Sequence, residues 1–234
     1  MAVALAFFAL VLWLLFAALC ARIVLDQPRQ RPGLQEEPLV GLAYLFVKLY
    51  VALMHRGRAR GLQHVPQLRD AGPLIVVSNH TAGVDPMLLQ AFLPCEVTWM
   101  MGRDMMVPGF ADIWEFLSII GVEREGTGKA GRDMAALRRA VKTLKGGGVV
   151  GICPEGHIPT NGEIGGFSPG VGMLMLLSGA PALVARVSGT PRADRAWKSL
   201  LRRSHSRVEF LGVVRATEGE KAEALTARLR AMLD

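Results

Sequence analysis

Residues Pro73–Pro86, which read PLIVVSNHTAGVDP, form the stretch that decides the fold. They open with the apolar run Leu74–Val77, in which three of the four residues are β-branched. A short apolar run between a proline and polar residues is typical of a buried strand. Asp followed by Pro is typical of a helix start, with Asp85 at the N-cap and Pro86 at the first helical position. The pattern therefore predicts a strand, a tight turn that presents His80, and then a helix.

His80 and Asp85 are thereby placed at the carboxyl end of a strand, where open α/β sheets bind ligands. An imidazole titrates near neutrality and can accept a proton from a hydroxyl group. A carboxylate on its other nitrogen fixes the tautomer and stabilises the imidazolium that forms. We expect the nucleophile to be a substrate hydroxyl, not a serine or cysteine of the chain. The alternative is structural: Asp85 only caps the helix and His80 is only a turn residue.

A second strand-like run, Val149–Cys153, leads into the motif P-E-G-H at positions 154–157, in which Glu155 lies 75 residues after His80 (155 − 80). The motifs N-H-x4-D-P and P-E-G, each after a buried strand, resemble those of the glycerolipid acyltransferases of the lysophosphatidate (1-acylglycerol-3-phosphate) acyltransferase type. Gly121–Arg124, between them, resembles the arginine block of that family. Residues 179–184 and 187–190 resemble its last block. The resemblance covers roughly Arg60 to Val214.

This resemblance implies an α/β fold, a mixed sheet flanked by helices, with N-terminal membrane helices. It also implies transfer of a fatty acyl group from acyl-CoA or acyl-carrier protein to the hydroxyl of a lysophospholipid, without a metal or cofactor. The implied roles are general base for His80, orienting partner for Asp85, headgroup binding for Arg124, acceptor binding for Glu155 and Gly156, and support for Asn79, Pro154 and His157. A guanidinium suits the headgroup role because it binds phosphate in a bidentate manner.

The third motif departs from the family pattern. After P-E-G the family usually has Thr and then Arg, whereas this chain has His157 and Ile158. The acceptor is therefore either a lysophospholipid held differently or a lipid without a phosphate, and His157 either hydrogen-bonds it or is a plain loop histidine. Two other functions stay open: an inactive, membrane-anchored lipid-binding relative, and hydrolysis by a water that His80 activates.

The composition narrows the class of protein and of partner. Apolar residues make up 51% of the 234 residues and charged residues 20%, which excludes a disordered chain. The net charge of +7 suits a membrane surface or an anionic substrate, and the absence of a basic-aromatic module argues against a nucleic-acid partner. The three cysteines are too far apart for a disulfide framework or a metal cluster. A zinc site of His80, Asp85, Glu155 and His157 is chemically feasible, but the spacing matches no metal motif.

The N-terminal part predicts membrane attachment. Residues 1–21 carry no charge and would form a helix of about 31 Å, long enough for an uncleaved anchor, although half of an embedded hairpin is the alternative. Arginines follow this segment, which predicts a cell inner-membrane location with the catalytic domain in the cytoplasm. Leu39–Met54, interrupted by Lys48, suits an interfacial helix or a buried core helix. We expect residues 1–60 to anchor the protein and residues 61–234 to form the catalytic domain.

The rest of the chain alternates between expected strands and helices, as in an α/β sheet protein. Strands are expected at 97–100, 118–122, 182–187 and 208–214, and helices at 110–117 and from 129 to the glycines at 146–148. The sequence Thr217–Glu220 fits a capping box for a last helix, with Leu225, Leu229 and Met232 facing inward.

Overall fold

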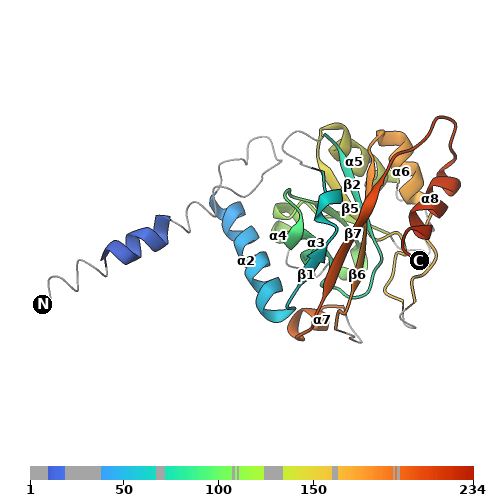
Figure 1. The fold of residues 1–234 in the computed structure, drawn as a ribbon. Coiled ribbons are helices and arrows are strands. Elements are labelled where there is room, and N and C mark those ends of the chain that lie inside the picture. Colours follow the sequence, from blue (N-terminus) through green and yellow to red (C-terminus); the bar gives the residue numbers. More distant parts are fainter. Residues whose placement is uncertain are drawn as a thin grey trace, which may run out of the picture.

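The structure is a computed structural model, and it describes residues 10–18, 38–66, 72–106, 109, 111–123, 134–159, 163–191, 193 and 196–234. A seven-stranded sheet forms its centre, and helices cover both faces (Figure 1). Its strands are β1 (Arg58–Arg60), β2 (Leu74–Ser78), β3 (Thr98–Gly102), β4 (Ile120–Val122), β5 (Val149–Ile152), β6 (Ala182–Ser188) and β7 (Arg207–Val214). The helices are α2 (Pro38–Met54), α3 (Asp85–Phe92), α4 (Ala111–Phe116), α5 (Met134–Lys145), α6 (Gly170–Ser178), α7 (Lys198–Leu201) and α8 (Ala222–Ala231), with 3-10 turns at Leu62–His64 and Arg103–Met105.

The sheet has the order β1-β7-β6-β2-β5-β3-β4. All neighbours pair in parallel except β6 and β7, which are antiparallel. The expected mixed sheet is therefore confirmed. Because β2, β5, β3 and β4 run in the same direction, their carboxyl ends meet at one edge of the sheet, and the loops after them can share a site.

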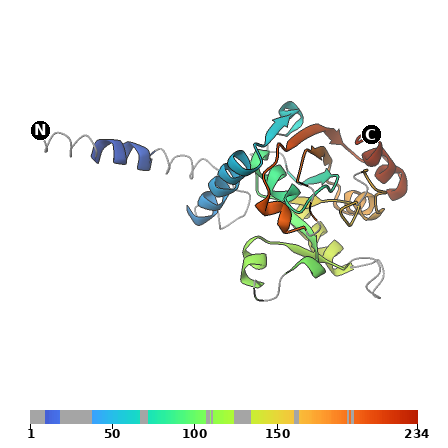
Figure 2. The same cartoon turned by 90° about the horizontal axis from the view of Figure 1, so that it is seen from below.

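Alternation along β2 explains why both faces of the sheet are covered. Leu74 and Val76 pack into one core, beneath α2, α3, α4 and α7, whereas Ile75 and Val77 pack into the other, beneath α5, α6 and α8. All five residues of β2 are buried. A strand buried on both faces must be apolar throughout, which is the pattern that predicted it. Seen from below, α2 and α8 lie at opposite sides of the sheet (Figure 2).

Most expected elements are present, but two helix starts differ from the prediction. Asp85 is not the N-cap of α3: Val84 has that position, and the Asp85 carboxylate points back to the preceding turn. Thr217–Glu220 closes on itself through the Glu220 carboxylate and ends directly before Lys221, which is the N-cap of α8. In the last helix Leu225 and Leu229 are buried and Met232 is half-buried, as expected.

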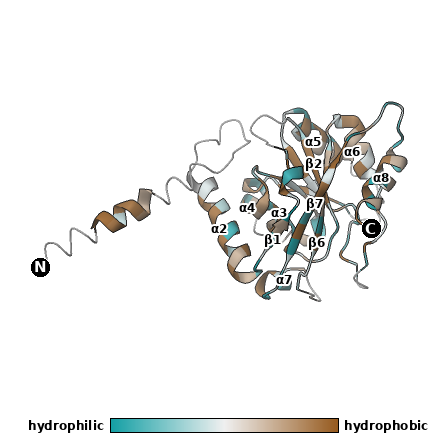
Figure 3. Ribbon diagram, viewed as in Figure 1, coloured by the Kyte–Doolittle hydropathy of each residue, from teal (hydrophilic) through white to brown (hydrophobic). Residues whose placement is uncertain are grey.

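The N-terminal part is described only in segments. Residues 10–18 are helical, and the remainder of the expected anchor at 1–21 lies outside the described residues. Helix α2 has a buried side, with Tyr44 and Val51, and a solvent-exposed apolar side. In Figure 3 this helix is largely brown, with a hydrophilic turn near its middle. Among the described helices, none combines the length and the apolar character needed to cross a membrane.

The sheet begins before the expected catalytic domain. Strand β1, within the basic stretch that we assigned to the linker, pairs with β7 through Arg58 and Arg207. Residues 58–60 therefore belong to the sheet, and the division of the chain at position 60 stays a prediction.

Candidate active site

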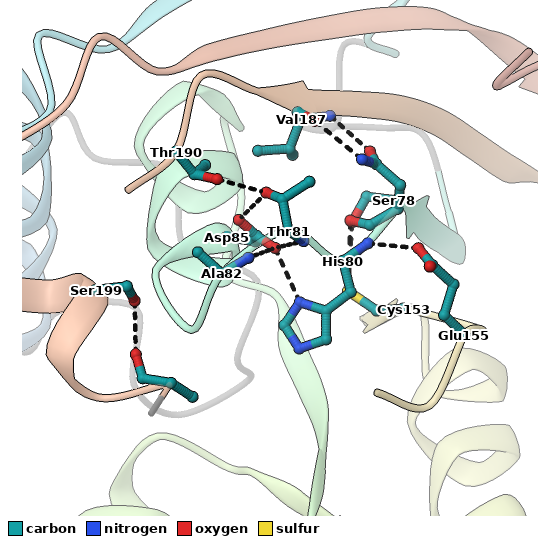
Figure 4. A network of polar contacts seen from close by, with 12 residues as sticks. Ser78, His80, Thr81, Ala82, Asp85, Cys153, Glu155, Val187, Thr190 and Ser199 are labelled. Carbon is teal, nitrogen blue, oxygen red and sulfur yellow. Dashed lines mark hydrogen bonds and ion pairs between the residues drawn. The ribbon is translucent and has the colours of Figure 1, made fainter. Parts of the chain in front are cut away.

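The turn between β2 and α3 presents His80 at the carboxyl edge of the sheet (Figure 4). The His80 ring and the Asp85 carboxylate face each other, with 2.8 Å between Nδ1 and Oδ2. The Asp85 side chain is fully buried, and that of His80 is 17% exposed. The pair that the sequence predicted is therefore brought together, with the carboxylate inside and the imidazole at the surface.

Three further hydrogen bonds hold the Asp85 carboxylate. Oδ2 accepts from the backbone N–H groups of Thr81 (2.6 Å) and Ala82 (2.9 Å), and Oδ1 accepts from the Thr81 hydroxyl (2.9 Å). A carboxylate surrounded by donors is an acceptor only, so His80 Nδ1 must carry the proton. Nε2 is then left with a free lone pair, and no described residue is bonded to it. This is the protonation state that a general base requires.

Asn79 fixes the turn to the neighbouring strand. Its side-chain amide donates to the carbonyl of Val187 (2.9 Å) and accepts from the N–H of Val187 (2.7 Å). The amide side chain thus takes the place of a backbone partner at the end of β6. Asn79 has a supporting position, one residue before His80, for which we expect the role of general base.

Glu155 is 6% exposed and bonds to two backbone groups. Oε1 accepts from the N–H of His80 (2.7 Å), and Oε2 accepts from the N–H of Gly165 (2.8 Å). These contacts suit a positioning role, and the acceptor contact that the resemblance implied for Glu155 stays a prediction. Glu155 joins the loop after β5 to the backbone of His80.

The other residues of the P-E-G-H motif shape the loop. Pro154 is buried, whereas Gly156 and His157 are exposed. Gly156 has a φ of 71°, a left-handed conformation that favours glycine. The exposed positions leave Gly156 and His157 open to a ligand.

Cys153 lies beneath the catalytic turn, next to Ser78 (3.4 Å between Sγ and Oγ). Burial, reinforced by the nearby Asp85 and Glu155 carboxylates, raises the pKa of the Cys153 thiol to about 12. It is therefore a thiol near neutral pH, and only a thiolate is an effective nucleophile.

A serine motif that sequence reasoning missed needs a separate test. Residues 166–170 read GFSPG, which fits the G-x-S-x-G spacing of serine hydrolases. In those enzymes the serine stands on a sharp turn between a strand and a helix. Here Ser168 follows a loop, its N–H donates to Pro154, and its hydroxyl accepts from the N–H of Gly170. The setting is that of a helix start at α6 and not of a nucleophile.

Two further contacts close the turn, one from Thr190 and one from Ala196. The Thr190 hydroxyl donates to that of Thr81 (2.9 Å). A Cβ on Gly83 would lie 2.4 Å from the carbonyl oxygen of Ala196. Only glycine, which has no Cβ, allows so close an approach. The sequence alone does not indicate this contact.

The predicted headgroup residue, Arg124, lies outside the described residues. Its neighbour Glu123 pairs with Arg103 (3.3 Å), which directly follows β3. β3 is next to β5 in the sheet, so Arg103 lies at the same edge as His80 and Glu155. Sequence reasoning missed this arginine, because the predicted strand ended at Met100 and β3 continues to Gly102, directly before Arg103.

The described residues contain no group of three or more His, Cys, Asp and Glu side chains that could hold a metal ion. Of the four residues considered as zinc ligands, His80 and Asp85 pair with each other, Glu155 bonds to backbone N–H groups, and His157 is exposed.

Comparisons with known proteins agree with this geometry. The model of a family described as Acyltransferase matches residues 56–188, more than half of the chain. The fold is similar to the crystal structure of the 1-acyl-sn-glycerophosphate (LPA) acyltransferase PlsC from Thermotoga maritima. The TM-score is 0.64 and the identity 19%, over 87% of this chain and 81% of that one. The sequence has no match among curated proteins. The family resemblance seen in the motifs is confirmed.

Proposed function

Because this chain belongs to the acyltransferase family, we propose that it transfers a fatty acyl group from an acyl thioester to the hydroxyl of a lysophospholipid such as 1-acylglycerol-3-phosphate. The thioester is acyl-CoA or acyl-carrier protein, and the product enters phospholipid biosynthesis or remodelling. The observation that carries the proposal is the His80–Asp85 pair, with Nδ1 held by a buried carboxylate and Nε2 directed away from it.

The reaction needs one proton carrier and no metal or cofactor. Nε2 of His80 takes the proton of the acceptor hydroxyl as its oxygen attacks the thioester carbonyl carbon. The tetrahedral intermediate then collapses, the carbon–sulfur bond breaks, and the imidazolium returns its proton to the leaving thiolate. Asp85 stabilises the imidazolium between these steps.

Binding of the acceptor headgroup is assigned to Arg103, at the edge of the sheet, and to Arg124. Neighbouring strands are about 4.8 Å apart, so a group after β3 lies about 10 Å from one after β2. A lysophospholipid can span that separation between its hydroxyl and its phosphate. Arg103 is the described cation at this edge, and Arg124 is the second candidate.

The N-terminal part is proposed to attach the enzyme to the cell inner membrane, with the catalytic domain in the cytoplasm. The support is the uncharged segment at 1–21, the arginines that follow it, and the apolar outer side of α2. A C-terminal tag should then resist protease in intact cells. We expect the protease to cleave the tag only after the cells are lysed. Cleavage in intact cells would contradict the cytoplasmic orientation.

The experiment that tests the activity is lipid mass spectrometry. The full chain and its His80→Ala variant are incubated with acyl-CoA or acyl-carrier protein and a panel of lysolipids. We expect a new diacyl product that the variant forms about 10²–10⁴-fold more slowly. Release of free fatty acid without a lipid product would favour hydrolysis, and no turnover would favour an inactive, lipid-binding relative.

A second acceptor class is supported by one observation. Position 158, where the family usually has arginine, is an isoleucine, and His157 beside it is exposed. A hydroxylated lipid without a phosphate fits that environment better than a phosphate monoester does. Ile158→Arg should improve the use of lysophosphatidate if the acceptor is a phosphate, and should leave the use of a neutral acceptor unchanged or worse.

A further inference from the structure

Helix α7 carries large apolar side chains that face solvent. Trp197 is 51% and Leu201 71% exposed. Exposed apolar side chains that cluster on one surface mark a place where something binds. Neither residue takes part in the site described above, so their exposure needs a separate account.

The segment that carries α7 is tied to α2. The Tyr50 hydroxyl donates to the carbonyl of Leu200 (2.5 Å), and the buried His55 ring bonds to Tyr50 (2.9 Å) and to Ser204 (2.8 Å). Figure 1 shows α7 beside the lower end of α2. The two helices therefore lie side by side and are joined by hydrogen bonds.

The same segment also contacts the catalytic turn. Ser199 donates to the carbonyl of Ala196 (2.6 Å), which is the oxygen that lies against Gly83. Figure 4 shows Ser199 beside the turn that carries His80. Whatever binds α7 is consequently close to the general base.

Basic side chains surround the apolar ones. Residues 196–207 contain Lys198, Arg202, Arg203 and Arg207 and no acidic residue. Arg202 and Arg203 are exposed next to Leu201, and Arg56 is exposed at the end of α2. On α2, Leu49 and Leu53 are 51% and 73% exposed.

This combination points to one occupant. A lipid bilayer takes up leucine side chains, accommodates tryptophan at the headgroup level, and attracts arginine when its lipids are anionic. We propose that Trp197, Leu201, Arg202 and Arg203 form, with Leu49 and Leu53, a docking surface for an anionic bilayer. Its α7 part lies outside residues 1–60, the stretch proposed to anchor the protein, and extends the contact with the membrane, where the lipid acceptor resides, toward the catalytic turn. The statement that the lipid acceptor resides in this membrane rests on the proposed function, whereas the docking itself does not.

The charge part of the proposal has a matched control in the same chain. Arg202→Gln/Arg203→Gln is compared with Arg138→Gln/Arg139→Gln, which removes the same charge from an exposed pair on α5, at the opposite end of the molecule in Figure 1. An arginine near an anionic surface contributes about fivefold to binding, so the α7 pair should lower partition onto phosphatidylglycerol-containing vesicles about 25-fold. Partition onto pure phosphatidylcholine vesicles should change little. Equal losses in both variants would overturn the charge argument.

The apolar part of the proposal is tested by measuring whether Trp197 enters the bilayer. Full-length wild type and Trp197→Phe are bound to vesicles that contain brominated lipid, which quenches tryptophan on contact. Quenching should fall in Trp197→Phe and stay unchanged in Trp114→Phe, a half-buried residue of α4. Equal quenching in wild type and Trp197→Phe would show that α7 does not enter the bilayer. A dimer in solution that Leu201→Ser dissociates would instead assign the surface to a second copy of the chain.

Vesicle partition and tryptophan quenching do not require turnover, so they test the docking surface independently of the acyltransferase proposal. An activity measurement with two forms of the acceptor connects docking with turnover. With a short-chain lysolipid dissolved as monomers, the Arg202→Gln/Arg203→Gln variant should keep the wild-type rate, and with vesicle-borne acceptor it should be slower. An equal slowing on both substrates would contradict the docking role.

Discussion

Glu155→Gln tests whether the buried carboxylate positions the general base or binds the acceptor. In the structure each carboxylate oxygen accepts from one backbone N–H, that of His80 at 2.7 Å and that of Gly165 at 2.8 Å. A glutamine has one oxygen, so its amide N–H₂ must face one of these two donors in either orientation. The substitution therefore removes the charge and leaves one buried N–H unpaired, while the volume stays the same.

The magnitude follows from the bonds that are lost. A hydrogen bond to a charged group contributes about 1.5–3 kcal/mol and a neutral one about 0.5–1.5 kcal/mol. Replacing two charged bonds by one neutral bond should lower the free energy of unfolding by about 2–5 kcal/mol. For a chain of this size the melting temperature changes by about 2–4 °C per kcal/mol, so a fall of about 4–20 °C is expected.

The kinetic effect should appear in kcat. The lost bond holds the backbone of His80, and a displacement of about 1 Å of a catalytic group can cost about 100-fold in rate. KM for the acceptor should change little, because Glu155 does not face solvent. Glu163→Gln, an exposed acid in the same loop, is the matched control and should leave both the melting temperature and kcat near wild type. A Glu155→Gln variant with unchanged stability and kcat, but a raised acceptor KM, would refute the positioning role.

Three further predictions concern other contacts. Asp85→Asn can keep the hydrogen bonds from the turn but lacks the charge that stabilises the imidazolium. We therefore expect kcat to fall by about 10²–10⁴-fold while the far-UV circular dichroism spectrum stays unchanged. A wild-type kcat would contradict the pairing. Burial lowers the pKa of His55, so the neutral ring stabilises the fold fully above the unfolded-state pKa near 6.5, and this stability is lost as the pH falls below that value. His55→Gln should therefore flatten the fall in melting temperature between about pH 7 and pH 5. An unchanged slope would show that His55 does not cause the fall. Gly151→Ala would place a Cβ 2.3 Å from the Trp99 ring and should cost about 1–3 kcal/mol in denaturant unfolding, whereas no loss would mean that Trp99 moves freely.

The parts of the fold that the sequence predicted are those whose signal is local. The strand at β2 is apolar on both faces, and Pro86 marks the start of α3. Strand β1 was not predictable in this way, because a three-residue strand exists only through its pairing with β7, where Arg58 meets Arg207, 149 residues away (207 − 58). Helix α6 was missed for a related reason. Its glycines are unfavourable in an isolated helix, and Gly172 is explained only by α8, whose Ala222 carbonyl oxygen would lie 2.1 Å from a Cβ.

The site shows the same division between local and distant information. His80 and Asp85 are five residues apart, so their pairing could be inferred from spacing and turn chemistry. The role of Asp85 as an N-cap was wrong because its carboxylate had a second set of donors in the turn, which compete for the same oxygens. The second contact of Glu155, to Gly165, depends on the course of the loop between β5 and α6, which no local pattern specifies.

The described contacts also indicate that the residues that carry out acyl transfer differ from those that select the acceptor. Both oxygens of Asp85 and both oxygens of Glu155 are occupied by groups of the chain, and Cys153 is held as a thiol. Among the described residues of this turn, Nε2 of His80 is the atom that we propose to react with the substrate. If one atom carries the acid–base chemistry, substrates are distinguished by how the site holds them. The choice of acceptor must therefore depend on side chains outside the turn, which makes Arg103 and position 158 the informative places to change.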